Sequence, residues 1–275
     1  MTKILLPTDF SDNALSAIMY TLKLYQHEKC TCYLLNSSNV KSSRISSFSN
    51  KLLTTMIENA KKDVLQLKAQ IESTNSNSNH TFEAIISIEN LDDAIETYIQ
   101  KYDIDLVVMG TKGATGAKEI LFGSNTTKIF KKVKSCPVLA IPNNYTFEVP
   151  KQIAFPSDFN RDCDAKELHY LKNLADLHRS KIRIIHINEN QLLNKKQENN
   201  LATLNEYLKN YEHSFHLIPN YATKETSIQD FIEELGIDML AMVNYSHSFI
   251  DSILREPVIK KIAFHLKVPF LVIPE

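Results

Sequence analysis

The chain contains the same sequence pattern twice, and this repeat constrains the fold more than any single motif. Leu6-Pro-Thr-Asp-Phe10 is echoed by Phe155-Pro-Ser-Asp-Phe159. Near the other end of each copy, Pro137-Val-Leu-Ala-Ile-Pro142 is echoed by Pro269-Phe-Leu-Val-Ile-Pro274. Repeated anchors at both ends of two long segments indicate an internal duplication, so we expect two homologous domains.

Short apolar runs alternate with helical stripes between these anchors. In the first copy the runs predict strands at residues 3–8, 32–35, 82–88, 106–109 and 137–142, separated by helices at about 11–27, 49–71, 91–101 and 124–134. The second copy repeats the strands at 153–155, 182–187, 215–218, 239–243 and the terminal run. Such alternation is typical of parallel βαβ units. We therefore predict an α/β chain of two tandem Rossmann-like domains, 1–146 and 150–275, each with a five-stranded parallel sheet flanked by helices.

Charge and hydropathy exclude several classes of partner. The formal net charge of −1 gives no general attraction to nucleic acid or to an acidic membrane surface. The apolar run before Pro7 is too short for a signal peptide, and no run approaches the length of a membrane span. We therefore expect a cytoplasmic protein with neither a nucleic-acid nor a membrane partner.

No metal site is predicted from the cysteines and histidines. In the cytoplasm the four cysteines are expected to stay reduced. Cys30-Thr-Cys32 lacks the CxxC spacing and a second ligand pair, so we interpret it as two thiols at the edge of a strand. His247 and Asp251 form an i, i+4 pair without a third ligand, which favours a surface position.

The chain has only 5 glycines, and four of them fall between Gly110 and Gly123. Glycine permits positive φ and close approach to the backbone, so this concentration indicates a local geometric demand. An apolar strand precedes the segment and a helix is predicted after it. A strand, a glycine loop and a helix start together present backbone N–H groups and a helix dipole to an anion, and phosphate is the expected ligand.

Several donors in this segment could hold a phosphate. Gly113 and Gly123 free backbone N–H groups, Ser124 is predicted as the N-cap of the following helix, and Asn125 and Thr126 add donors in its first turn. The Walker A pattern is absent because no Lys-Ser/Thr pair follows the last glycine. The lysines at 112 and 118 could neutralise phosphate charge, but a lysine in a polar loop is usually solvated.

Gly110-x2-Gly113-x9-Gly123-Ser124, followed by a helix and Pro-Val-Leu-Ala-Ile-Pro142, resembles the nucleotide-binding signature of the universal stress protein family. The opening Leu-Leu-Pro-Thr-Asp-Phe-Ser is similar to the first strand of that family. The resemblance implies an adenine-nucleotide site at the carboxyl ends of the strands, where open α/β sheets bind ligands. It further implies these roles: Asp9 at the ribose or adenine edge, Pro7 and Thr8 along the base, Ser37 at the adenine, Met109 and Gly110 beside the ribose, and Gly113, Gly123, Ser124, Asn125 and Thr126 around the phosphates.

The second copy departs from this signature. Counting back from the terminal Ile-Pro places Arg255 against Gly123 and Glu256 against Ser124. The loop before them is two residues shorter than in the first copy, and Asn244 is interpreted as the equivalent of Gly110. A carboxylate at the expected phosphate position repels an anion, so we expect no triphosphate in the second domain. Asp158 is retained, which leaves a smaller or unphosphorylated ligand open.

Three functions are compatible with the sequence. The first is a cytoplasmic stress-response protein that binds ATP, or ADP or AMP, in its first domain and acts as a nucleotide-dependent regulator. The second is a slow adenine-nucleotide hydrolase or adenylating enzyme, for which no catalytic residue is assigned. The third is an interaction module that needs no nucleotide. Mg²⁺ and a homodimer are left open, and by resemblance to the family the two domains are expected to form an internal pseudo-dimer through their last strands.

Overall fold

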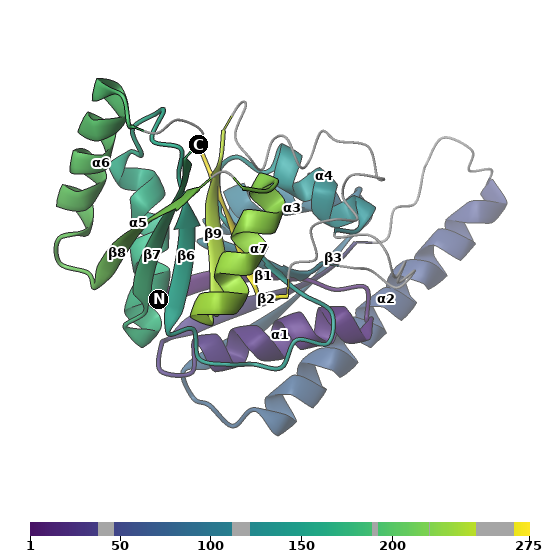
Figure 1. Ribbon diagram of the computed structural model, residues 1–275. Helices are drawn as coiled ribbons and strands as arrows, with labels where there is room; N and C mark the ends of the chain where they lie inside the picture. Colours follow the sequence, from purple (N-terminus) through teal and green to yellow (C-terminus); the bar gives the residue numbers. More distant parts are fainter. Residues whose placement is uncertain (38–46, 112–121, 189–191, 220, 246–266) are drawn as a thin grey trace. The chain divides into compact units, whose positions relative to one another are not determined.

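The computed structural model describes residues 1–37, 47–111, 122–188, 192–219, 221–245 and 267–275 (Figure 1). The chain divides into two compact units, of which unit 1 holds Met1–Ala117 and Phe122–Asn144 and unit 2 holds Tyr145–Glu275. Each unit is an α/β domain built on parallel strands, which confirms the predicted fold class.

Unit 1 is a doubly wound sheet with helices on both faces. Its strands lie in the order β3-β2-β1-β4-β5, and all their pairings are parallel. Figure 1 shows α1 and α2 on one side of these strands and α3 and α4 on the other. The elements are β1 (Thr2–Pro7), α1 (Asp12–Leu24), β2 (Cys30–Ser37), α2 (Ser47–Thr74), β3 (His80–Ser87), α3 (Leu91–Tyr102), β4 (Leu106–Gly110), α4 (Ser124–Lys132) and β5 (Val138–Ile141).

Unit 2 repeats this arrangement. Its strands lie in the order β10-β9-β6-β7-β8, again with parallel pairing throughout. Figure 1 shows α7 in front of the strands of this unit. The elements are β6 (Gln152–Pro156), α5 (Ala165–His178), β7 (Lys181–Asn188), α6 (Lys195–Leu208), β8 (His213–Pro219), α7 (Lys224–Leu235), β9 (Met239–Asn244) and β10 (Phe270–Pro274).

The apolar pattern of each strand matches its place in the sheet. All residues of β4, β5, β9 and β10 are buried, as expected for strands covered on both faces. In β3, at the edge of the unit 1 sheet, buried residues alternate with more exposed ones. The strand order reverses between β1 and β4 in unit 1 and between β6 and β9 in unit 2. These reversals are the topological switch points where ligands of open α/β sheets bind.

Strand register corrects one expected equivalence between the copies. Gly110 pairs with Ile141 in unit 1, whereas Val243 pairs with Ile273 in unit 2. Because Ile141 and Ile273 are matching residues of the repeated anchor, the counterpart of Gly110 is Val243 and not Asn244. The expected equivalence relied on the length of the loop, which can differ between the two copies. Strand pairing, in contrast, fixes which residues are equivalent.

Among the described residues, no helix is both long enough and apolar enough to cross a membrane.

The cysteines lie deeper than expected. Cys30 is the first residue of β2, in line with the predicted position at the edge of a strand, but the side chains of Cys30 and Cys32 are both fully buried on one face of β2, with their sulfur atoms 3.8 Å apart. All four cysteines are free thiols, and only Cys163 is partly exposed. Burial raises the pKa of the Cys136 thiol far above its usual range and that of Cys163 to about 12.

These environments predict slow thiol modification in the native protein. The thiolate is the reactive form and the reagent must reach it, so fully buried thiols and thiols with raised pKa values react poorly at neutral pH. We expect iodoacetamide to modify at most Cys163 in the native chain and all four cysteines in denaturant, as read by mass spectrometry. Rapid native labelling of Cys30 or Cys32 would contradict the packing of β2.

Candidate functional site

The predicted site residues that the structure describes gather at the carboxyl ends of three neighbouring strands and at the start of one helix. Pro7 ends β1 and is followed by Thr8 and Asp9, Ser37 ends β2, and Met109 and Gly110 end β4. Gly123 and the first turn of α4 complete the set. Gly113 lies outside the described residues, as do the lysines at 112 and 118.

The loop after β1 is fixed by its own backbone and by β2. The Thr8 hydroxyl accepts a hydrogen bond from the Phe10 N–H at 3.0 Å, and the Thr8 N–H donates to the Leu35 carbonyl at 2.8 Å. The Thr8 carbonyl accepts from the side-chain amide of Asn36 at 2.8 Å. Thr8 is therefore a buried structural residue whose bonds set the direction of the loop.

Asp9 stands exposed beyond this anchored turn. Its Oδ1 accepts hydrogen bonds from the Ser11 N–H and hydroxyl, at 3.1 and 2.6 Å. Ser11 in turn caps α1, because its hydroxyl oxygen accepts from the Ala14 N–H. Phe10 adopts a left-handed φ of 62° and is 42% exposed, which is unusual for a large aromatic residue. The turn thus holds a carboxylate and an aromatic ring beside the switch point.

At the end of β4, the first helix explains why residue 110 is glycine. A Cβ on Gly110 would lie 2.5 Å from Oδ1 of Asn13, a separation that no real contact allows. The buried Asn13 side chain donates across to the carbonyls of Ile141 and Pro142, at 3.3 and 3.4 Å. Asn13 thus ties the start of α1 to the end of β5 and occupies the space over Gly110.

The start of α4 is tied to the same strand end. The Gly123 N–H donates to the Thr111 carbonyl at 2.7 Å. The buried Thr126 hydroxyl lies 3.2 and 3.3 Å from the carbonyls of Gly110 and Thr111. The Thr126 side chain therefore positions the helix, while Ser124 and Asn125 lie exposed in its first turn.

The helix begins one residue earlier than the predicted cap implies. Gly123, not Ser124, is the N-cap, with a φ of −59° that any residue can adopt. Glycine here is therefore not required by positive φ. Because Gly123 has no side chain to cap the helix, the N–H groups of the first turn receive no bond from their own cap.

Sequence reasoning missed Asn13 and Asn36, and it assigned Ser37 only in part. The Ser37 hydroxyl donates to the Glu89 carbonyl at 2.6 Å, so in this structure it links β2 to the segment after β3. Asn13 carries a signal that could have been used, since it is a polar residue beside the apolar stripe of α1. Asn36 carries none, because its partner is a backbone carbonyl far away in the sequence.

Unit 2 repeats the loop after its first strand almost bond for bond. The Ser157 hydroxyl accepts from the Phe159 N–H, as Thr8 does from Phe10, and Phe159 has a φ of 55°. Oδ1 of Asp158 accepts from the Asn160 N–H at 2.9 Å. His186 takes the place of Asn36 and lies 2.9 Å from the Ser157 carbonyl. Arg255, Glu256, His247 and Asp251 lie outside the described residues.

The structure defines a class of protein, the doubly wound α/β domains, with an acidic turn and an uncapped helix start at the switch point where such sheets bind ligands. The model of the universal stress protein family matches residues 1–142, and the chain belongs to this family. It is 28% identical over 158 residues to Universal stress protein MJ0577 from Methanocaldococcus jannaschii, a match that covers 50% of this chain and 93% of the relative.

Solved structures of the same family share the fold over nearly the whole chain. A universal stress protein from Archaeoglobus fulgidus matches with a TM-score of 0.72 and 20% identity, covering 99% of this chain and 96% of its own. A universal stress protein from Pseudomonas aeruginosa matches with a TM-score of 0.58 and 13% identity, covering 100% and 93%. These matches show a shared two-domain α/β fold.

The contact between Asn13 and Gly110 predicts a non-additive pair of substitutions. Gly110→Ala forces a methyl group into the Asn13 side chain and is expected to cost about 1–3 kcal/mol of unfolding free energy. Asn13→Ala frees that space, so the double variant should cost clearly less than the sum of the two single variants. Urea unfolding of the four proteins measures this coupling.

Gly236→Ala is the control, because nothing lies within 4 Å of its added Cβ and only its φ of 59° is strained. Its cost should be independent of Asn13→Ala. Additive costs for Gly110→Ala and Asn13→Ala would contradict the packing at the end of β4.

Proposed function

We propose that unit 1 binds an adenine nucleotide, ATP or its products ADP and AMP, and that the protein acts in the cytoplasm as a nucleotide-dependent regulator of the stress response. Membership of the universal stress protein family supports this proposal. The nucleotide would lie across the ends of β1 and β4, with its phosphates at the start of α4.

The observation that carries the proposal is the chemistry of the α4 N-terminus. Of the helices whose N-cap is described, α4 alone has neither a side-chain cap nor an acidic residue in its first turn. The others neutralise the positive end of their dipole with their own carboxylates or caps. An uncompensated helix start favours an external anion, and the phosphate groups of a nucleotide supply one.

The rest of the proposed site fits a nucleoside. Asp9 presents a carboxylate beside the switch point, where it could accept from the hydroxyl groups of a ribose. Ser124 and Asn125 are exposed in the first turn of α4 and can add hydroxyl and amide donors for phosphate oxygens. In this proposal the backbone geometry of the site is fixed by Thr8, Gly110 and Thr126, and this is their contribution to binding.

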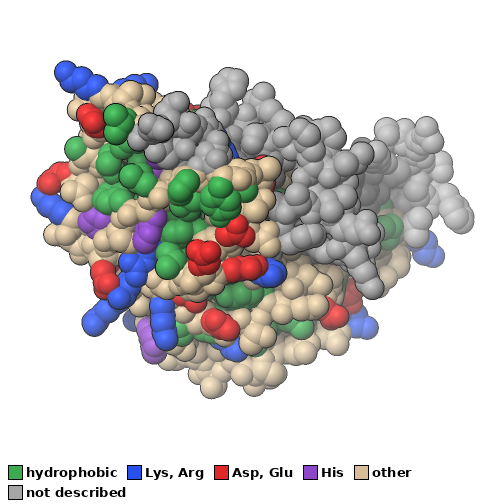
Figure 2. Space-filling view, in the orientation of Figure 1, with side chains coloured by type: hydrophobic (Ala, Val, Ile, Leu, Met, Phe, Trp, Pro, Cys, Tyr) green, Lys and Arg blue, Asp and Glu red, His purple; other side chains and the backbone are tan. Residues whose placement is uncertain are grey.

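Surface charge supports a small ligand over a nucleic acid. Figure 2 shows basic and acidic side chains interspersed over the described part of the face that it draws. Together with the net charge of −1, this mixture of charges on the face drawn does not favour binding of the phosphate backbone of a nucleic acid.

Calorimetric titration with ATP, ADP and AMP, with and without Mg²⁺, tests the proposal. We expect one nucleotide per chain. Asp9→Ala should weaken binding about tenfold, the effect of losing one charged hydrogen bond of about 1.4 kcal/mol. Gly123→Arg should weaken it further, because its side chain crowds the helix start.

Asp158→Ala is the matched control, since it removes the same carboxylate from the repeated loop of unit 2. It should leave the nucleotide affinity unchanged. Equal losses for Asp9→Ala and Asp158→Ala, or no binding by the wild-type chain, would refute a nucleotide site in unit 1.

A further inference from the structure

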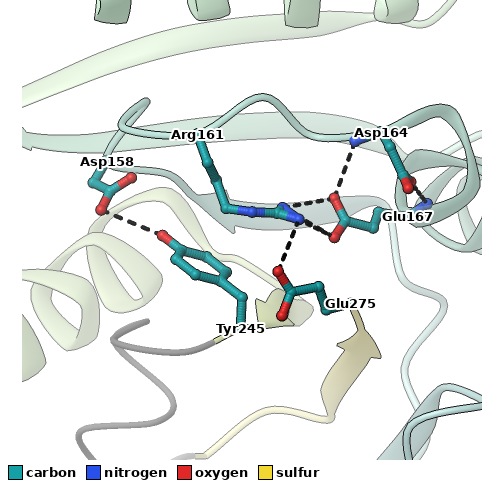
Figure 3. Close-up of polar contacts among 6 residues, drawn as sticks. All are labelled: Asp158, Arg161, Asp164, Glu167, Tyr245 and Glu275. Atoms are coloured by element: carbon teal, nitrogen blue, oxygen red, sulfur yellow. Dashed lines mark hydrogen bonds and ion pairs between the residues drawn. The ribbon is translucent and has the colours of Figure 1, made fainter.

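The switch point of unit 2 is bridged by side chains of the protein itself. Tyr245 follows β9 directly, and its hydroxyl donates to Oδ2 of Asp158, after β6, at 3.3 Å (Figure 3). Asp158 is the counterpart of Asp9, so this bond joins the two strand ends between which unit 1 is proposed to hold its ligand. Burial and the nearby Asp158 carboxylate raise the pKa of the Tyr245 hydroxyl, which therefore stays protonated.

A guanidinium group lies directly against this tyrosine. The Arg161 Cζ is 4.7 Å from the centroid of the Tyr245 ring, within the range of a cation–π interaction. Its Nη1 donates to both carboxylate oxygens of Glu167 at 2.9 Å, and its Nη2 bonds to Oε1 of the same carboxylate. Nη2 also lies 4.0 Å from Glu275 (Figure 3). A planar cation is thus held between an aromatic face and two carboxylates.

Glu167 occupies the place that Asn13 has in unit 1. The buried residues of α1 include Asn13, Ala14 and Ala17, and those of α5 include Glu167, Leu168 and Leu171 in the same phase. Asn13 can donate to the end of the last strand, but a carboxylate cannot. The Glu167 side chain is only 1% exposed, so its charge needs a cation, and burial raises its pKa while Arg161 lowers it.

The chain supplies that cation through a longer loop. One residue, Ser11, separates Phe10 from α1, whereas residues 160–164 separate Phe159 from α5. Arg161 lies in this extra segment. The loop is also held from α6, since the side-chain amides of Gln197 and Asn200 donate to the carbonyls of Asp158 and Phe159, at 2.9 and 2.8 Å.

We propose that the ligand end of unit 2 is a guanidinium-binding pocket, formed by Tyr245, Glu167 and Glu275, which the chain fills with its own Arg161. The pocket has the chemistry of a cation receptor, an aromatic face opposite a buried carboxylate that accepts a forked pair of hydrogen bonds. Unit 1 is proposed to bind an anion at the equivalent position, whereas this pocket binds a cation. Arg161 is thus an internal ligand that closes this switch point.

Chemical rescue tests the pocket. Arg161→Ala leaves Glu167 buried without its cation and should lower the melting temperature of the chain by about 5–10 °C. Millimolar methylguanidinium should restore at least half of this loss in a saturable manner. Urea, a neutral molecule of similar shape, and sodium chloride at equal ionic strength should restore none of it.

Arg183→Ala is the matched control, because the Arg183 guanidinium bonds only to the neutral Gln152 and Ser214 side chains among the contacts described for it. Methylguanidinium should not rescue this variant. Rescue should also vanish in Arg161→Ala/Glu167→Gln, which should be more stable than Arg161→Ala alone.

The rescue experiment contains no nucleotide, so its outcome tests the pocket independently of the nucleotide site proposed for unit 1. Saturable rescue that depends on Glu167 supports the proposal. Absence of rescue, or equal rescue of Arg183→Ala, would overturn it. If Arg161→Ala does not fold, Arg161→Gln serves instead, since its neutral side chain leaves the Glu167 carboxylate without a cation and open to the same probe.

Discussion

The contact between the first helix and the ends of β4 and β5 is the constraint on which the site depends. In unit 1 the Asn13 amide reaches the end of β5, and its side chain occupies the space above residue 110. Only glycine fits there, so helix and strand approach closely. Thr126 and Gly123 then dock α4 on the same strand end. The geometry of the proposed ligand site follows from this packing.

Unit 2 meets the same constraint with different chemistry. Glu167 replaces the amide, and a carboxylate that is almost fully buried is stable only with a cation beside it. Arg161 provides this cation, and Tyr245 covers it. In the two proposals, two copies of one backbone carry opposite charge preferences at equivalent strand ends, as expected if chemistry belongs to the site and not to the fold.

Most of the fold could be predicted from the sequence because it rests on local patterns and on repetition. The apolar runs predicted all ten strands in the described part of the chain, and Ser11 was correctly predicted as the N-cap of α1. The site was predicted less well. Ser124 proved to be the first helical residue and not the cap, and Val243, not Asn244, proved to be the counterpart of Gly110. The first error came from the preference of serine for the N-cap position, and the second from relying on loop length, which does not fix strand register.

The sequence by itself determined the α/β class, the duplication and the family, because apolar periodicity and repeated anchors are properties of the linear chain. Only the tertiary structure decided the roles of individual side chains. It showed that Gly110 is required by Asn13, that Thr8 and Thr126 bind backbone carbonyls, and that Arg161 lies on Tyr245. These roles depend on contacts between residues far apart in the chain, and such contacts exist only once the strands have paired and the helices have packed on them.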